Sequence, residues 1–416
     1  MPNKLILVMI DGVSADTFKT QRGRLPNLSL LAQNGLVIEN LHSERLGTSL
    51  PGRTGILTGV TADVSGVYAN MIWDAAESRF RYANPDDIRV PTLPARMTSA
   101  GRKSATIGFG MVRPEDATIF KPPWWVGEYV QRARDVEPVP SDASWQRVHA
   151  HQNAGDLFNS WCESAGYPQD WSAPHDDSSA TQMMYGFIND HHAVNWAGIC
   201  ASAPDAPDLI MTETMMTDTL QHYTGYNSPY SHFSFAEADA LIGVLMARLR
   251  AGGVADEWNI AIMSDHGHSP IETAIYTNVI LPDVRVQSEG SVLLVAPRDP
   301  AELAHVTRVL GDYGCEQMPV DFVPEDQREP LTAFVAPDGM DFEEASAGIT
   351  TPTGAPLLKS NHGLRPGLPG DDRFAVFYGP DVNTGTIDFA DAVQIAPTCA
   401  RLLGLPLDGF MGEPLL

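Results

Sequence analysis

Two short segments pair an acid with a histidine at spacings that suit metal binding. Asp218 and His222 lie four residues apart, so a helical turn would place both side chains on one face. Asp265 and His266 are adjacent and precede Gly267, which permits the irregular turn that both need to reach one cation. A carboxylate oxygen and an imidazole nitrogen together suit Zn²⁺. Both segments therefore predict metal ligands, although an ordinary polar turn would explain either one alone.

Two further candidate ligands stand close to apolar runs. Asp11 directly follows the apolar residues 5–10, so its carboxylate is expected at a sheet edge, where it would serve as a ligand or as a helix N-cap. His362 lies in a polar turn ahead of a predicted strand. A lone histidine is more often structural, but the other segments leave a metal centre one ligand short. His268 would be either a third metal ligand or, as we favour, a residue that contacts one of the metal-binding side chains.

Ser49 is the candidate nucleophile, within the sequence Thr-Ser-Leu-Pro-Gly-Arg at residues 48–53. The residues that follow read as the start of a helix, where free amides and the positive end of the dipole suit a phosphoryl group. Serine is a weak nucleophile that needs a base or a metal. The sequence shows no GxSxG motif and no Ser-His-Asp arrangement, so activation by a metal is favoured. A plain helix N-cap is the alternative interpretation.

The elements between these residues must bring them together. Strands are predicted at residues 5–10, 36–41, 104–109, 208–212, 259–263 and 374–378, and helices at 26–33, 93–100, 233–250 and 392–403. Strands that alternate with helices predict an α/β fold, with a mostly parallel central sheet and helices on both faces. Ligands bind such sheets at the carboxyl edge of the strands, which is where the candidate residues fall.

Two stretches interrupt the alternation of strands and helices. Residues 111–206 are rich in Pro, Trp, His and Asp and have weak periodicity, and residues 287–347 hold a short strand, a helix and Pro-rich loops. We predict that both are insertions into a single catalytic domain, residues 1–416, and that both cap the carboxyl edge of the sheet.

Composition limits the partners. The chain has 416 residues and a net charge of −25, from 52 acids against 27 bases. Such an acidic surface argues against a nucleic acid or an anionic membrane as partner, and an anionic substrate would need a bound cation to draw it in. The four cysteines are far apart and predict buried thiols. No apolar run is long enough for a membrane span or a signal peptide, so a cytoplasmic protein is expected.

Taken together, the motifs resemble the alkaline phosphatase superfamily. The closest likeness is to its type I phosphodiesterase/nucleotide pyrophosphatase branch, which is related to phosphonoacetate hydrolases. The likeness is carried, in this order along nearly the whole chain, by Asp11-Gly12, Ser49-Leu50-Pro51 with Leu57-Thr58-Gly59, Asp218-x-x-x-His222, Asp265-His266-Gly267 and His362-Gly363. The resemblance implies an alkaline-phosphatase-like fold and hydrolysis of phosphate esters.

The resemblance also implies roles for individual residues. Two Zn²⁺ ions would be held, one by Asp218, His222 and His362, the other by Asp11, Asp265, His266 and the Ser49 oxygen. Ser49 would form a covalent phosphoserine, and the Asn70 amide would donate to a non-bridging oxygen of the substrate. Arg53 is expected to contact the nucleophile loop or the substrate. Apart from the resemblance, the aromatic side chains of Phe109, Trp124 and Trp125 are themselves candidates to stack a base or an aryl group, unless they belong to the core.

The predicted function is a two-metal phosphodiesterase that acts on a small-molecule ester through phosphoserine. A phosphonate hydrolase is the first alternative, although residues 108–113 offer only Arg113 where phosphonoacetate hydrolases carry lysines. A sulfatase is the second, because Ser49-x-Pro51-x-Arg53 resembles the sulfatase signature, whereas the Asp218/His222 pair favours the phosphate branch. A metal-stabilised binding protein without activity is the alternative from another class. The sequence predicts no oligomeric state.

Overall fold

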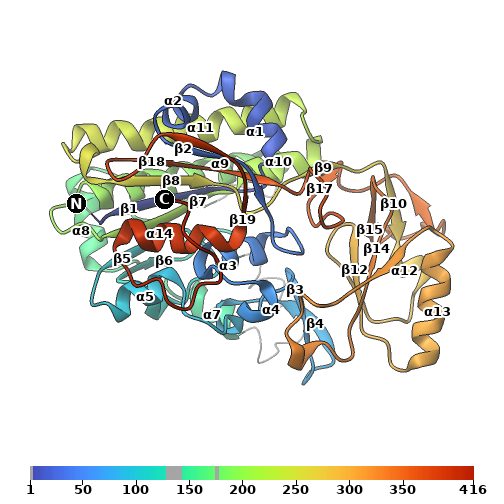
Figure 1. Ribbon diagram of the computed structural model, residues 1–416. Coiled ribbons are helices and arrows are strands. Elements are labelled where there is room, and N and C mark those ends of the chain that lie inside the picture. Colours follow the sequence, from blue (N-terminus) through green and yellow to red (C-terminus); the bar gives the residue numbers. More distant parts are fainter. Residues whose placement is uncertain (1–2, 128–142, 174–177) are drawn as a thin grey trace.

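A mostly parallel sheet forms the centre of the computed structural model, which describes residues 3–127, 143–173 and 178–416. In these ranges eight strands pair in the order β19-β2-β18-β8-β1-β7-β5-β6 (Figure 1). Their bounds are β1 Leu5–Ile10, β2 Leu36–His42, β5 Ser104–Ile107, β6 Ile119–Lys121, β7 Leu209–Thr214, β8 Asn259–Met263, β18 Arg373–Tyr378 and β19 Gly385–Asp391. All pairs are parallel except those that β18 makes with β2 and β8. The predicted fold class is confirmed.

Strand β1 shows why the strands of this sheet appear in the sequence as continuous apolar runs. All six of its residues are fully buried. Successive side chains point to opposite faces of a strand, so the odd-numbered residues pack into one hydrophobic cluster and the even-numbered residues into another. Because helices cover both faces, neither set is polar.

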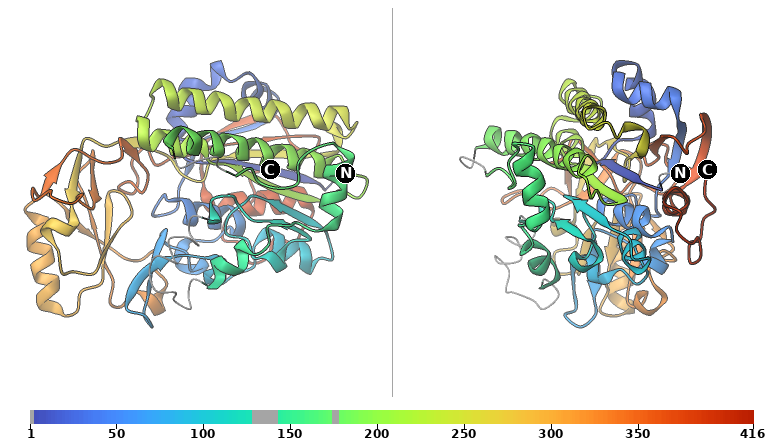
Figure 2. Two further views of the ribbon diagram at one scale, coloured as in Figure 1. Left: turned by 180° about the vertical axis from the view of Figure 1, so that it is seen from behind. Right: turned by 90° about the vertical axis from the view of Figure 1, so that its left-hand side faces the viewer.

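Helices form a layer on each face of the sheet (Figures 1 and 2). One layer includes α1 Ala15–Gln21, α2 Pro26–Asn34, α9 Ser179–Ala201 and α11 Pro229–Ala251. The other layer includes α3 Ser49–Thr58, α5 Leu93–Ser99 and α14 Ile395–Leu403. Further helices are α4 Ala62–Ser65, α7 Ala143–His149, α8 Asp156–Ser164, α10 Met216–Thr224 and α12 Thr277–Ile280. Within the described ranges, no helix is long and apolar enough to cross a membrane.

The described part of residues 111–206 differs from the expected cap. Strand β6 pairs with β5 at one end of the central sheet, and helix α9 packs against β7 and α11. This segment therefore adds a strand and a helix to the central sheet and its helical layer, and it also lines a cavity that reaches His222. Its many polar and aromatic residues obscured the helical period of α9. Residues 128–142 and 174–177 of the predicted insertion lie outside the described residues.

The second insertion forms a small lobe beside the central sheet, seen at the right in Figure 1. It contains the sheets β11-β12-β14-β13 and β15-β10-β16, helix α13 (Pro300–Gly311) and a hydrophobic cluster of its own. Its strands are β10 Thr273–Tyr276, β11 Val286–Ser288, β12 Val292–Val295, β13 Glu316–Met318, β14 Thr332–Val335, β15 Met340–Glu343 and β16 Thr353–Gly354. The lobe extends beyond the predicted bounds of 287–347. The sequence did not indicate its full extent, because strands of two to four residues are too short to show a hydrophobic period.

Two further strand pairs lie outside these sheets. Strands β3 (Met71–Asp74) and β4 (Arg79–Tyr82) form an antiparallel hairpin. Strands β9 (Ser269–Pro270) and β17 (Ser360–Asn361) pair where the chain enters and leaves the small lobe.

Candidate active site

The topology brings the candidate residues to one edge of the sheet. Strands β1, β7 and β8 are parallel neighbours, so their carboxyl ends meet there. Asp11 follows β1, helix α10 follows β7, and Asp265 follows β8. Strand β2 runs the same way and leads to helix α3, which begins with the candidate nucleophile Ser49, whereas the antiparallel β18 begins at this edge, after the turn that holds His362.

The first candidate metal centre contains Asp218, His222 and His362. One ligand atom from each residue lies within 4.8 Å of the others. Helix α10 places Asp218 and His222 on one face, with Asp218 Oδ2 at 3.2 Å from His222 Nε2. His222 Nδ1 donates to the Ser360 carbonyl at 3.0 Å, which turns Nε2 toward the centre. His362 Nε2 lies 3.9 Å from Asp218 Oδ1.

The second candidate centre contains Asp11, Asp265 and His266, which are all fully buried. His266 Nε2 lies 3.2 Å from Asp11 Oδ1 and 3.7 Å from Asp265 Oδ2. His266 Nδ1 donates to the Gly267 carbonyl at 3.0 Å, so the ring is fixed with Nε2 toward both carboxylates. The remaining oxygen, Asp265 Oδ1, accepts the backbone N–H groups of Gly12 and His266.

Ser49 lies beside the second centre, and the two centres are themselves adjacent. The rings of His266 and His362, one from each centre, have centroids 4.1 Å apart. Ser49 is the first residue of α3, and its Oγ lies 3.0 Å from His266 Nε2. The Oδ1 atom of Asn70 accepts the N–H of Leu50 at 2.8 Å. The Ser49 hydroxyl therefore lies beside the second cluster of candidate ligands, and Asn70 is hydrogen-bonded to the next residue of the chain, Leu50.

The electrostatics of the second centre favour a cation. Burial and the neighbouring Asp265 raise the pKa of Asp11 to about 7, even though Arg53 opposes the shift. Burial by itself would lower the pKa of His266, but Asp265 and Asp11 raise it to about 10. Asp11 Oδ1 is buried and accepts no hydrogen bond. A cation among these atoms would replace the His266 proton and leave both carboxylates ionised.

The first centre differs, because its carboxylate is held in the ionised form by neighbouring histidines. Burial would raise the pKa of Asp218, but His222 and His268 hold it well below its usual range. His268 Nε2 donates to Asp218 Oδ1 at 2.8 Å and its Nδ1 lies 3.1 Å from Ser360 Oγ. His268 thus orients a candidate ligand, as the sequence predicted.

Arg53 requires a correction, because its guanidinium is 1% exposed and faces carboxylates rather than the open space beside Ser49. The two NH groups donate to Asp11 Oδ2 at 2.6 Å and Asp265 Oδ2 at 2.8 Å, and Nε donates to Glu213 Oε2 at 3.0 Å. Arg53 therefore balances and orients acids of the second centre instead of contacting substrate. Glu213 was missed by sequence reasoning, although an acid near the end of the apolar strand β7 is a usable signal.

Replacing Arg53 with alanine should destabilise the fold strongly, since three buried carboxylates would lose their partner. We expect the free energy of unfolding to fall by about 3–5 kcal/mol, measured by urea denaturation. The matched control is Arg22→Ala, which breaks a half-exposed pair with Glu39 at 2.7 Å and should cost under about 1 kcal/mol. Equal losses in the two variants would contradict the role assigned to Arg53.

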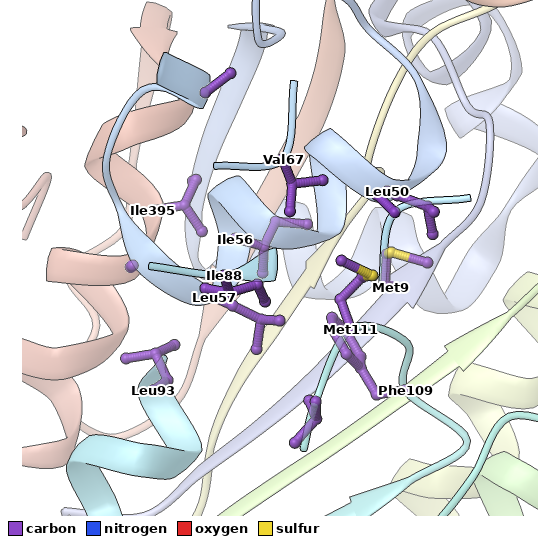
Figure 3. Packing of buried hydrophobic residues seen from close by; sticks show 14 of the residues in the cluster. Met9, Leu50, Ile56, Leu57, Val67, Ile88, Leu93, Phe109, Met111 and Ile395 are labelled. Carbon is purple, nitrogen blue, oxygen red and sulfur yellow. The ribbon is translucent and has the colours of Figure 1, made fainter. Parts of the chain in front are cut away.

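Phe109 requires the second correction. Its side chain is fully buried and packs in the core with Met9, Leu50 and Met111 (Figure 3). It therefore offers no face to a substrate. Trp125 is also buried, and its indole N–H donates to Glu213 at 2.7 Å.

Two aromatic residues of the predicted set, Trp124 and Trp125, line a cavity. The cavity is about 360 Å³ in volume and reaches the candidate ligand His222. Its lining is largely apolar and comprises Trp124, Trp125, Gln182, Met183, Met215, Met216, Thr219, His222 and Tyr223.

Side chains of α10 also hold the backbone around Asp11, which the sequence did not indicate. Thr217 Oγ1 donates to the Asp11 carbonyl, and Gln221 Nε2 donates to the Gly12 carbonyl at 2.6 Å. Gly12 has φ of +71°, and a Cβ there would lie 2.8 Å from Asp218 Oδ1. This position needs glycine both for its conformation and for the close approach of the two centres.

A family comparison decides the class of the protein. Residues 5–338 match the model of the family described as Type I phosphodiesterase / nucleotide pyrophosphatase. The chain belongs to this family. The match confirms the resemblance to this branch of the alkaline phosphatase superfamily, and it makes the protein a hydrolase of the phosphodiesterase/nucleotide pyrophosphatase class. The family is metal-dependent, in agreement with the two clusters of candidate ligands.

Individual relatives of the phosphodiesterase family are distant but cover the whole chain. Bis(5'-adenosyl)-triphosphatase ENPP4 of Homo sapiens is 22% identical over 441 residues, which is 99% of this chain and 81% of that protein. The structure of human ectonucleotide pyrophosphatase / phosphodiesterase 5 has a TM-score of 0.69 at 15% identity and covers 99% of this chain and 96% of that one. The structure of an inactive variant of the murine protein in complex with AMP has a TM-score of 0.71 at 16% identity. It covers 99% of this chain and 97% of that one.

Proposed function

We propose that this hydrolase cleaves small phosphodiesters through a covalent phosphoserine at Ser49, with two zinc ions bound at the candidate centres. One observation carries the proposal. Ser49 is the first residue of helix α3, and its Oγ lies 3.0 Å from His266 Nε2, beside the candidate ligand clusters. A helix N-terminus favours a phosphoryl group, and a hydroxyl beside cationic centres suits nucleophilic attack.

The residues present fit two cations. Each centre offers acid oxygens and imidazole nitrogens, which is a donor set typical of zinc. The buried Asp11 Oδ1 without a hydrogen bond, and the raised pKa of Asp11, are the features that a cation would satisfy. Asp218, His222 and His362 would hold one ion, and Asp11, Asp265 and His266 the other, with Ser49 Oγ beside the latter. When bound, such ions supply Lewis-acid stabilisation of phosphoryl charge and favour ionisation of a hydroxyl.

Each remaining role in the proposed reaction belongs to a side chain of the protein. Ser49 Oγ forms the bond to phosphorus as the bond from phosphorus to the leaving oxygen breaks, and water later cleaves the phosphoserine. Because Asn70 Oδ1 accepts from Leu50, the Asn70 Nδ2 hydrogens are the ones available to a non-bridging oxygen. Arg53 keeps the carboxylates of the second centre in place.

The organic group of the substrate would occupy the cavity beside His222. Trp124 and Tyr223 offer aromatic surfaces there, and the methionines adapt to different shapes. The complex of the murine structural neighbour with AMP supports a nucleotide as this group. A phosphonate is less well supported, because Arg113 pairs with Asp86 and Asp116 instead of facing Ser49.

A panel of chromogenic esters tests the proposed function. The nitrophenyl ester of AMP and bis-nitrophenyl phosphate should have kcat/KM at least about tenfold above nitrophenyl phosphate, because a second substituent fills the cavity. Nitrophenyl phenylphosphonate and nitrophenyl sulfate complete the panel. Faster turnover of the sulfate, together with formylglycine at position 49 by mass spectrometry, would instead establish a sulfatase.

A pair of tyrosine variants links this preference to the cavity. Tyr223→Ala should raise KM for the AMP ester more than for bis-nitrophenyl phosphate. Tyr230→Ala is the control, since Tyr230 is similarly exposed but does not line the cavity. Equal kinetics in both variants would place the organic group elsewhere.

A further inference from the structure

One turn of the small lobe, residues 289–291, contacts two of the turns that form the site. Gly290 has φ of +90°, and a Cβ there would lie 2.1 Å from the His362 carbonyl oxygen. Gly363 faces it with φ of +66°, and a Cβ there would lie 1.7 Å from the Glu289 carbonyl oxygen. The Ser291 N–H donates to the Gly363 carbonyl at 3.0 Å. The two backbones touch because neither glycine carries a side chain.

The side chain of Glu289 reaches the second turn. It is 4% exposed, and its two carboxylate oxygens accept the backbone N–H groups of Asn70 and Met71, each at 2.8 Å. Asn70 in turn accepts the N–H of Leu50, the residue after Ser49. A continuous chain of hydrogen bonds therefore connects the small lobe with the start of the nucleophile helix.

The hairpin that follows Asn70 also packs on the small lobe. The Arg285 guanidinium lies over the Trp73 ring at 5.2 Å from its centroid. Figure 1 shows strands β3 and β4 between the central sheet and the lobe. The position of Asn70 is thus set by the small lobe as well as by helix α3.

We propose that Glu289 is a positioning residue, which fixes Asn70 so that its amide donates to the phosphoryl group during attack by Ser49. This inference rests on the proposed function of Asn70 and Ser49. A carboxylate suits the task because it offers an acceptor oxygen to each of two adjacent N–H groups. Glutamine has nearly the same shape, but its NH₂ group would face one of those N–H groups without accepting a bond.

The expected effect is on the rate of the chemical step. Glu289→Gln should lower kcat about tenfold with KM nearly unchanged, because the affected donor is used in the transition state. Asn70→Ala should lower kcat by about 100-fold, as for loss of one oxyanion donor. If Glu289 acts through Asn70, the double variant should be no slower than Asn70→Ala alone.

The experiment combines this double-mutant cycle with hydrogen exchange measured by mass spectrometry on the full chain. Glu289→Gln should speed exchange of the Asn70 and Met71 amides, whereas the control Glu344→Gln, at an exposed glutamate of the same lobe, should change neither rate nor exchange. Thermal unfolding and metal content of each variant separate a local effect from misfolding.

Two results would overturn the inference. An additional tenfold loss in the double variant would show that Glu289 does not act through Asn70, and unchanged exchange of both amides would show that it does not fix them. Absence of ester hydrolysis by the wild-type chain would instead defeat the proposed function. Hydrogen exchange would still decide whether Glu289 holds the Asn70 turn in that case.

Discussion

Replacing Ser49 with alanine should lower ester hydrolysis by at least about 10⁴-fold, since it removes the only hydroxyl proposed to attack phosphorus. The fold should be unaffected, because Ser49 is partly exposed and its helix is held by the buried residues that follow it. Ser49→Thr restores a hydroxyl at the same position and should recover a large part of the rate. Initial rates on bis-nitrophenyl phosphate measure all three proteins.

A trapping experiment separates a covalent role of Ser49 from a merely supporting one. Acid quenching during turnover should yield a phosphorylated peptide that contains Ser49, and the alanine variant should yield none. Wild-type rates in Ser49→Ala would rule out the covalent route.

Removal of bound metal should abolish activity to a similar degree. Dialysis against a chelator would leave Asp11, Asp218 and Asp265 close together without a cation, and the Lewis-acid contribution to the reaction would be lost. Added Zn²⁺ should restore the rate, and the thermal midpoint should rise with it because metal binds only the folded site.

Histidine variants locate this effect within the chain. His222→Ala should lose activity and bound metal, because His222 supplies a nitrogen to the first centre. His305→Ala, at an exposed position of α13, is the matched control and should change neither. Full activity of the chelated wild-type protein would contradict metal dependence in this chain.

The central strands and the candidate ligands were within reach of sequence reasoning because both signals are local. Strand β1 was predicted with its observed bounds, since six apolar residues end at an acid. Asp218 and His222 lie on one face of α10 as their four-residue spacing predicted. The parallel order of strands then places each ligand at one edge, without any detail of side-chain packing.

The roles of Arg53, Phe109 and Glu289 depend on packing, which the sequence does not show. Arg53 follows the candidate nucleophile by four residues, so a substrate contact was a reasonable prediction, yet three buried acids from other segments hold its guanidinium. Phe109 follows a strand that ends at the site, but it turns into the core. Glu289 lies 219 residues from Asn70 along the chain, and only the folded lobe brings them together.

The segments outside the central sheet were predicted least well, for a related reason. Helix α9 has 23 residues, but polar and aromatic side chains spread around it hid its apolar face. The short strands of the small lobe are defined by their partners rather than by their own sequence.

The most direct test of the account is an anomalous-difference map at the zinc edge, from crystals grown with Zn²⁺. Two peaks should appear beside Ser49, one among Asp218, His222 and His362 and the other among Asp11, Asp265 and His266. A map with no peak at either cluster, from crystals of active enzyme, would contradict a metal-assisted reaction at this serine.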